Sequence, residues 1–166
     1  DEAARCPASL VYNYDLLTGG GQYTQIDWRL FSRKFPYAKG VTDREPLYTR
    51  AYNLAQYYFG LYESKPWCFA EAEGLFASTT PLTYAAVYRN QVWGDWLIPI
   101  ANMDAKEQRS SLAFQAPEAL GLLPQENYIL FNVHQGVART IKGEAINQAF
   151  SEVAIPGQRL QLFCLR

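Results

Sequence analysis

Histidine is nearly absent from this sequence, in which the one histidine, His134, lies in the turn-like segment HQG. A single histidine excludes a histidine-rich metal site and leaves a serine or cysteine triad dependent on one turn residue, so we interpret His134 as incidental to chemistry. Cysteine is also scarce: Cys6, Cys68 and Cys164 stand far apart without metal-ligand spacing, which predicts buried free thiols. One disulfide with one free thiol is the alternative, and it leaves the redox compartment open. The sequence predicts no metal site and no cofactor.

Long apolar runs and blocks of one charge are missing as well. No run approaches the roughly 18 residues that a transmembrane helix needs, so we do not expect the chain to span a membrane. The first residues, DEAARCPASL, open with acids where a signal peptide has a basic and then an apolar region. Fifteen basic and sixteen acidic residues are interspersed and give a net charge of -1. Nucleic acid is not an expected partner, because no polybasic block would neutralise a phosphate backbone.

Aromatic residues are abundant: twelve Tyr, nine Phe and four Trp make up 15% of the 166 residues. Such residues favour β-sheets and also serve as stacking platforms for sugar rings, so their number does not choose between a core and a binding face. The length suits one domain, or a domain of about 100 residues with an extra segment.

From Leu82 onward, short apolar runs alternate with turn-rich breaks. The runs are LTYAAVYR, DWLIPIAN, QRSSLAF, NYILFNV, VARTI, AFSEVAI and RLQLFCLR, separated by segments such as NMDAKE, HQG, KGEA and PGQ. This spacing predicts an antiparallel β-sandwich of about seven or eight strands, and the pattern needs no helix there. Alternation supports the strands, because Ser110, Leu112 and Phe114 share one face of QRSSLAF.

The segment DWLIPIANMDAKEQRSSLAF, residues 95–114, predicts a hairpin. Trp96, Ile98 and Ile100 face one side, NMDAKE reverses the chain, and QRSSLAF returns beside the first strand with one wet face. Pro99 lacks the donor that a ladder needs, so we expect it at a bulge or on an edge. The runs YILFNV and LQLFCL are apolar on both faces, which indicates central strands or strands covered by a neighbouring domain.

The N-terminal segment, residues 1–64, differs from the sandwich domain expected at 65–166. SLVYNYDLL is consistent with a buried strand, and TGGGQYTQ with a flexible turn, since it lacks the Lys-Ser/Thr of a phosphate-binding loop. Residues 43–62 predict one amphipathic helix. Its apolar stripe comprises Leu47, Ala51, Leu54, Tyr58 and Leu61. We expect this stripe to pack on the sandwich or on another chain, and in the second case the helix would make the protein an oligomer.

Acidic and aromatic side chains are the candidates for chemistry. Paired carboxylates cleave glycosidic bonds, and Asp15 leads because it closes an apolar strand just before a glycine loop, where α/β barrels keep catalytic side chains. A solvated or capping carboxylate is the alternative reading of Asp15. Tyr88, Trp93 and Trp96, in and beside QVWGDW, are candidates for stacking on a sugar ring, with core packing as the alternative. The other carboxylates considered are Asp27, Asp43, Glu71, Glu73 and Asp95.

Three segments of the C-terminal half follow one another in a characteristic order. The first is a strand that ends in Ala101-Asn102, and the second is the run from Tyr128 to Phe131. The third, from Glu152 to Leu165, has an acidic residue two positions before an apolar one, then Pro-Gly, and then an apolar strand. Residues 66–166 thereby resemble the β-sandwich that follows the catalytic (β/α)8 barrel in many glycoside hydrolases. By order alone, residues 8–63 resemble the last strand, loop and helix of such a barrel. The resemblance implies a C-terminal piece, a processed subunit or a degenerate relative, and it carries over no catalytic residue.

The sequence therefore favours a non-catalytic accessory β-sandwich of a carbohydrate-active protein, docked on an adjacent catalytic domain or partner chain. The alternative is a stand-alone carbohydrate-binding or protein-interaction module that uses exposed aromatics. An independent small hydrolase built on Asp15 is a third hypothesis.

Overall fold

The computed structural model describes residues 64–67, 73–157 and 159–166 of the chain. The helix predicted at 43–62, the glycine-rich loop, Asp15, Cys6 and Cys68 lie outside these ranges. The strands are β1 (Ser64–Trp67), β2 (Phe76–Ser78), β3 (Thr83–Ala85), β4 (Val87–Asn90), β5 (Trp96–Asn102), β6 (Gln108–Ser110), β7 (Leu112–Phe114), β8 (Asn127–Asn132), β9 (Val137–Lys142), β10 (Val153–Ile155) and β11 (Leu160–Leu165). Short helical turns are η6 (Pro117–Leu120), η7 (Gly143–Ala145) and α4 (Ile146–Ala149).

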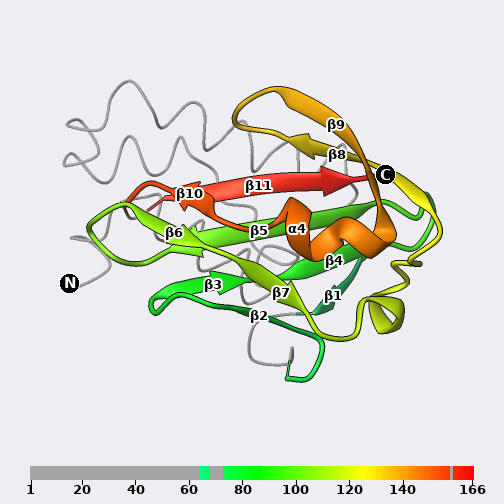
Figure 1. The fold of residues 1–166 in the computed structure, drawn as a ribbon, viewed down its shortest axis with the longest axis horizontal. Coiled ribbons are helices and arrows are strands. Elements are labelled where there is room, and N and C mark those ends of the chain that lie inside the picture. The colour runs from blue at the N-terminus through cyan, green and yellow to red at the C-terminus, as the bar shows by residue number, and fades with distance from the viewer. Residues whose placement is uncertain (1–63, 68–72, 158) are drawn as a thin grey trace, which may run out of the picture.

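Most strands join one antiparallel sheet, which we call the large sheet. Its order is β1-β4-β5-β11-β8-β9, and β3 pairs with β5 in line with β4 (Figure 1). Two antiparallel pairs, β10-β6 and β2-β7, form small sheets of their own. The described part is thus mainly β and antiparallel, as the alternation predicted. None of its helical turns is both long and apolar enough to cross a bilayer.

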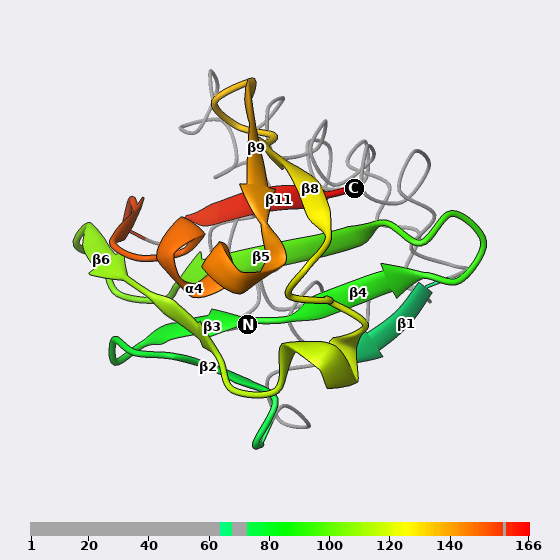
Figure 2. The same cartoon turned by 45° about the vertical axis from the view of Figure 1, so that its right-hand side comes forward.

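One face of the large sheet carries the core, and we call it the core face. The chain of β6, β7 and α4 lies across this face (Figure 2). Trp96, Ile98 and Ile100 of β5 belong to the hydrophobic cluster between the layers, as their shared face predicted. Phe150 is fully buried there, with its ring centroid 5.1 Å from that of Phe163 and 5.6 Å from that of Phe114. The short helix α4 was not anticipated, although it is what brings Phe150 into the core.

The predicted hairpin at residues 95–114 is wrong in its pairing. β6 pairs with β10 and β7 with β2, whereas β5 lies between β11 and the line of β3 and β4. The turn after β5 is held by the buried Asn102, whose Nδ2 donates to the carbonyl oxygens of Lys106 at 2.8 Å and Ile155 at 3.0 Å. This turn directs the chain into the second layer. Alternation specifies which side chains share a face of a strand, but not which strand lies alongside.

The prediction for Pro99 is also wrong, because Pro99 lies inside the central strand β5, opposite Leu162 of β11. On its other side the line of β3 and β4 is interrupted at Ala86, whose N–H donates to the Pro99 oxygen at 3.2 Å. Because proline has no backbone N–H, Pro99 cannot donate a hydrogen bond to the chain at Ala86, and the sheet lacks one hydrogen bond at this point. Burial on both faces holds the strand in place despite that loss.

Candidate functional site

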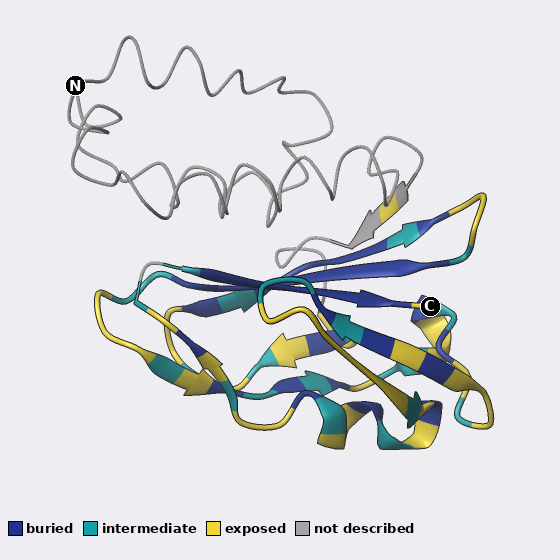
Figure 3. Cartoon of the chain, turned by 90° about the horizontal axis from the view of Figure 1, so that it is seen from above, coloured by how far each residue is buried: buried dark blue, intermediate teal, exposed yellow. Residues whose placement is uncertain are grey.

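The face of the large sheet opposite the core face is apolar, and we call it the outer face. Strand register places on it Tyr84, Ala86 and Tyr88 from β3 and β4, Leu97, Pro99 and Ala101 from β5, and Leu160, Leu162 and Cys164 from β11. All of these except Tyr84 are buried, and the hydrophobic cluster between the layers contains none of them. Figure 3 shows the central strands buried along their length. The central strands therefore present two buried apolar faces.

The outer face becomes exposed at β8, which lies next to the edge strand β9. Ile129 of β8 is 51% exposed, and Phe131, opposite Cys164, is half-buried. The prediction of two apolar, covered faces is therefore confirmed for LQLFCL of β11, whereas YILFNV of β8 is covered on the core face and partly open on the other. The covered area lies over β4, β5 and β11.

Cys164 is a free thiol on the outer face, which confirms the prediction of a buried free thiol for this residue. Burial raises the pKa of Cys164 to about 12, with a further contribution from the nearby Asp95 carboxylate. A thiol with this pKa stays protonated near neutral pH and is unreactive, because the thiolate is the nucleophile.

A turn between β4 and β5 presents the most exposed aromatic among the residues named as candidates. Trp93 is 63% exposed and its neighbour Val92 is 67% exposed. The Asn90 side-chain oxygen accepts the backbone N–H groups of both residues at 2.8 Å. Gly94 closes the turn with φ of 79°, a left-handed conformation that suits glycine. The turn is thus ordered by its own hydrogen bonds and holds the indole of Trp93 away from the core.

Trp96, three residues later, has the opposite environment. Its ring is 6% exposed and packs edge-on against Tyr128 at 5.6 Å between centroids. Its Nε1–H donates to the Leu120 carbonyl at 2.8 Å, and the Arg89 guanidinium lies 5.1 Å from the ring centroid. The closeness of Trp93 and Trp96 to the Gly-Asp pair of QVWGDW predicts one exposed and one buried ring, and the structure confirms this prediction.

Asp95 lies between these two tryptophans and is paired with Arg166. The guanidinium donates to both carboxylate oxygens, with Nη2 to Oδ2 at 2.8 Å and Nε to Oδ1 at 3.1 Å. The Asp95 side chain is only 9% exposed, and such bidentate geometry ties the β4-β5 turn to the end of β11. Asp95 therefore has a structural role in this conformation.

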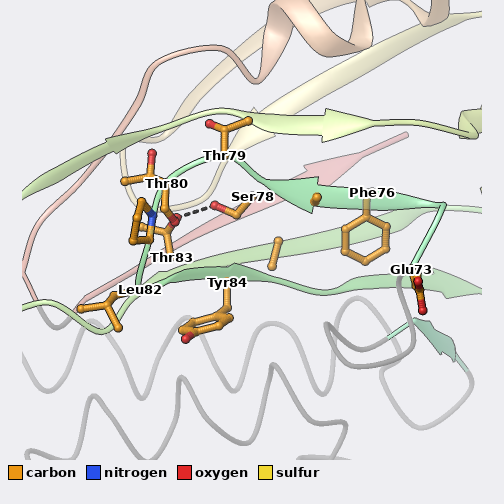
Figure 4. A pocket seen from close by; sticks show the side chains of 11 residues that line it. Glu73, Phe76, Ser78, Thr79, Thr80, Leu82, Thr83 and Tyr84 are labelled. Atoms are coloured by element: carbon orange, nitrogen blue, oxygen red, sulfur yellow. Dashed lines mark hydrogen bonds between the residues drawn. The ribbon is translucent and has the colours of Figure 1, made fainter.

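A pocket of about 510 Å3 opens beside the β2-β3 turn (Figure 4). The Ser110 hydroxyl contacts those of Ser78 at 2.7 Å and Thr83 at 3.0 Å, and the Ser78 and Thr83 hydroxyls contact each other. This network links three strands and uses the hydroxyls internally. Half-buried Tyr84 and exposed Leu82, the latter with φ of 59°, are among the apolar residues of the pocket wall. Nothing in the sequence pattern pointed to this pocket, although its lining residues all come from the segment 73–85.

His134 lies in the turn after β8, as its sequence context indicated, and it also has a structural contact. The Leu162 N–H donates to the His134 Nδ1 at 3.2 Å, so the turn is attached to β11. An accepting Nδ1 requires a neutral ring in the tautomer that carries its proton on Nε2. Burial lowers the pKa of His134, in agreement with that neutral form.

The candidate site residues that the sequence suggested do not lie together in the structure. Trp93 is exposed, Trp96 is in the core, and Tyr88 is 1% exposed on the outer face, so the three rings do not form one platform. Glu73 is exposed at the rim of the pocket, while Asp15 and Glu71 lie outside the described residues. The sequence did not show that the outer face is one continuous surface. The apolar runs of β5 and β11 were the pattern that could have indicated it.

Comparisons with known proteins find similarity to solved structures alone. No family model matches the chain, and no curated protein does. Among solved structures, one similar chain is the D197A variant of a GH27 β-L-arabinopyranosidase from Geobacillus stearothermophilus in complex with arabinose, at 12% identity and a TM-score of 0.36. The match covers 52% of this chain and 17% of that one, so the chain spans a small part of the solved protein.

Proposed function

We propose that this chain supplies a non-catalytic β-sandwich that docks on the catalytic domain or a partner chain of a carbohydrate-active protein. The observation that carries the proposal is the outer face, because strands β5 and β11 are apolar and buried on both sides while the core occupies one side only. A sheet with two buried faces is a middle layer, as expected of a sheet that is built into a larger body. Docking is therefore the role that this surface supports best.

The carbohydrate assignment rests on the resemblance of the sequence, and one contact supports the segments that carry it. Asn102, which ends the apolar strand, donates from Nδ2 to the carbonyls of Ile155 and Pro156 in the closing Pro-Gly segment. A Cβ added to Gly157 would lie 2.0 Å from the Ala105 oxygen, so the two turns are in close contact. Asn102 and the Pro156-Gly157 turn thus form one structural unit, which gives a physical reason why the two sequence features occur together.

The test is expression of the reading frame that encodes this chain together with any coding sequence upstream of it. The expected product hydrolyses aryl glycosides, the 166-residue chain by itself does not, and Leu97→Asp or Leu162→Asp on the outer face lowers the melting temperature of the whole product. Turnover by the chain alone, or an upstream sequence without a catalytic domain, would overturn the proposal.

A carbohydrate-binding module is the second candidate, and the exposure of Trp93 favours it. An indole held outward by an ordered turn can stack on a sugar ring. Titration with soluble oligosaccharides should then change the tryptophan fluorescence of the native chain and leave Trp93→Ala unchanged. Equal responses from both proteins, or no response from either, would refute stacking at this turn.

A further inference from the structure

A groove of about 380 Å3 opens between the two layers at the β9 end of the large sheet. One wall belongs to the core face, where Val137 lies opposite Asn132 and Arg139 opposite Leu130 in the β8-β9 pair. The other wall is the segment 149–154, which ends α4 and enters β10. The volume falls within the range of roughly 300 to 1,000 Å3 that small-molecule sites in proteins have.

Arg139 connects the two walls of this groove. Its Nη2 donates to the Ala149 carbonyl oxygen at 2.7 Å, and α4 lies beside β9 at this point (Figure 2). A guanidinium has several N–H donors, and the bond to Ala149 is the one that Arg139 makes within the described part of the chain. The guanidinium is therefore held in place at the groove and keeps donors for a ligand.

Glu152 lies on the opposite wall in a strained backbone conformation. Its φ is 54°, in the left-handed region that is unfavourable for residues other than glycine. Its N–H donates to the Ser111 hydroxyl oxygen at 3.0 Å, which holds the backbone in this conformation. The side chain is exposed and forms no ion pair with any residue that the structure describes, Arg139 included. A glycine would fit this backbone without strain, and strain of this kind is typical of positions whose side chain has a function.

We infer that this groove binds one unit of a carbohydrate, with Arg139 donating to sugar hydroxyls and Glu152 accepting from them. The inference rests on the carbohydrate role proposed above and names a site for it. A bound anion would be repelled by Glu152 and a bound cation by Arg139, so the pair suits a neutral ligand that both donates and accepts. A sugar hydroxyl does both, and hydrogen bonds to charged groups are about twice as strong as those between neutral groups.

The rest of the groove suits the apolar C–H groups of a sugar ring. Val137 is 56% exposed and Val153 is half-buried, so both present methyl groups to the groove. At its mouth, Gln135 adds an amide that can donate and accept. The Asn132 side-chain oxygen accepts the backbone N–H groups of His134 and Gln135 at 3.0 Å, which orders this turn.

Titration of the full 166-residue chain, labelled with 15N, tests the inference. The probes are the methyl glycosides of glucose, galactose, mannose and xylose at millimolar concentrations. At least one of them should shift the amide signals of residues 135–139 and 149–154. Arg139→Gln and Glu152→Gly should each weaken this binding on the order of tenfold, because each removes a charge-assisted hydrogen bond. Glu152→Gly should not lower the melting temperature, since glycine relieves the strain.

Arg109→Gln and Glu107→Gln are the matched controls, because both side chains are exposed, carry the same charges and lie outside the groove. Both should bind the glycoside as the unsubstituted chain does, and so should Trp93→Ala, whose ring belongs to the β4-β5 turn.

Four results would overturn the inference: no shifts with any of the glycosides, shifts confined to the β4-β5 turn, unchanged affinity in the two groove variants, or a loss of stability in Glu152→Gly that accounts for its weaker binding. Groove signals that change with protein concentration in the absence of sugar would also overturn it, since they identify a second copy as the occupant. If Arg139→Gln does not fold, Glu152→Gly decides alone, because it leaves the bond from Arg139 to Ala149 in place. A catalytic domain encoded upstream together with an unresponsive groove would refute the groove and leave the docking role intact, so the two proposals fail separately.

Discussion

Replacing Trp96 and Trp93 by alanine, one at a time, tests the core with a matched pair of residues from the same turn. Trp96→Ala should lower the free energy of unfolding by about 3 to 5 kcal/mol, the usual cost of removing a buried aromatic side chain. The structure supports the upper part of that range. The indole is 6% exposed, contacts Tyr128 and Arg89, and leaves the buried Leu120 carbonyl without its donor when it is removed. Trp93→Ala should change the free energy by less than about 0.5 kcal/mol, because the ring is 63% exposed.

Urea unfolding of both variants and of the unsubstituted chain, followed by far-ultraviolet circular dichroism, measures these differences. The dichroism signal is preferable to fluorescence, since each substitution removes one of the four tryptophans. The slope of free energy against urea should stay constant, which shows that the unfolded states are comparable. Similar small losses for both variants would refute the placement of Trp96 in the core. A large loss for Trp93→Ala would refute the exposed turn.

Three further predictions concern the turns that hold the layers together. Asn102→Ala should lower the free energy of unfolding by about 2 to 4 kcal/mol, measured by urea unfolding, because it leaves buried carbonyls without a donor, and Asn102→Asp should not rescue it. Gly157→Ala should lower the melting temperature, because its Cβ would lie 2.0 Å from the Ala105 oxygen, and an unchanged value would contradict the close approach of the two turns. The pKa of His134 is lowered from 6.5 on folding, so its contribution to stability is complete above that pH and decreases as the pH falls toward the folded pKa. His134→Gln should therefore reduce the loss of melting temperature between about pH 7.5 and about pH 5.5, and equal losses in both proteins would count against this account.

Local pattern was enough to predict which side chains share a face. Ser110, Leu112 and Phe114 are all buried, while Arg109, which precedes Ser110, is exposed, because successive side chains of a strand point to opposite faces. One exposed and one buried indole were predicted at QVWGDW because both tryptophans lie beside its Gly-Asp turn. The spacing of short apolar runs and turn-rich breaks likewise predicted the mainly antiparallel β class. These properties depend on near neighbours in the chain.

Pairing and position in the sheet could not be predicted in this way. QRSSLAF was expected beside β5, yet its two halves pair with β10 and β2, which come from more than thirty positions away in each direction. Pro99 was expected at an edge, yet it is tolerated in the centre because both faces of β5 are buried. In both cases the outcome depends on how all segments of the fold are buried together, and the sequence of one segment does not hold that information.

The sequence by itself thus determined the strands, their alternating faces and the two-sided apolar character of β11, because hydrophobic period is a local property of the chain. Tertiary structure alone decided that Asn102 holds the Pro-Gly turn, that Asp95 is paired with Arg166, and that the apolar residues of β4, β5 and β11 join into one outer face. The physical reason is that hydrogen bonds and surfaces between distant segments form only when the layers pack, and the register that aligns them is set by the burial of all strands together.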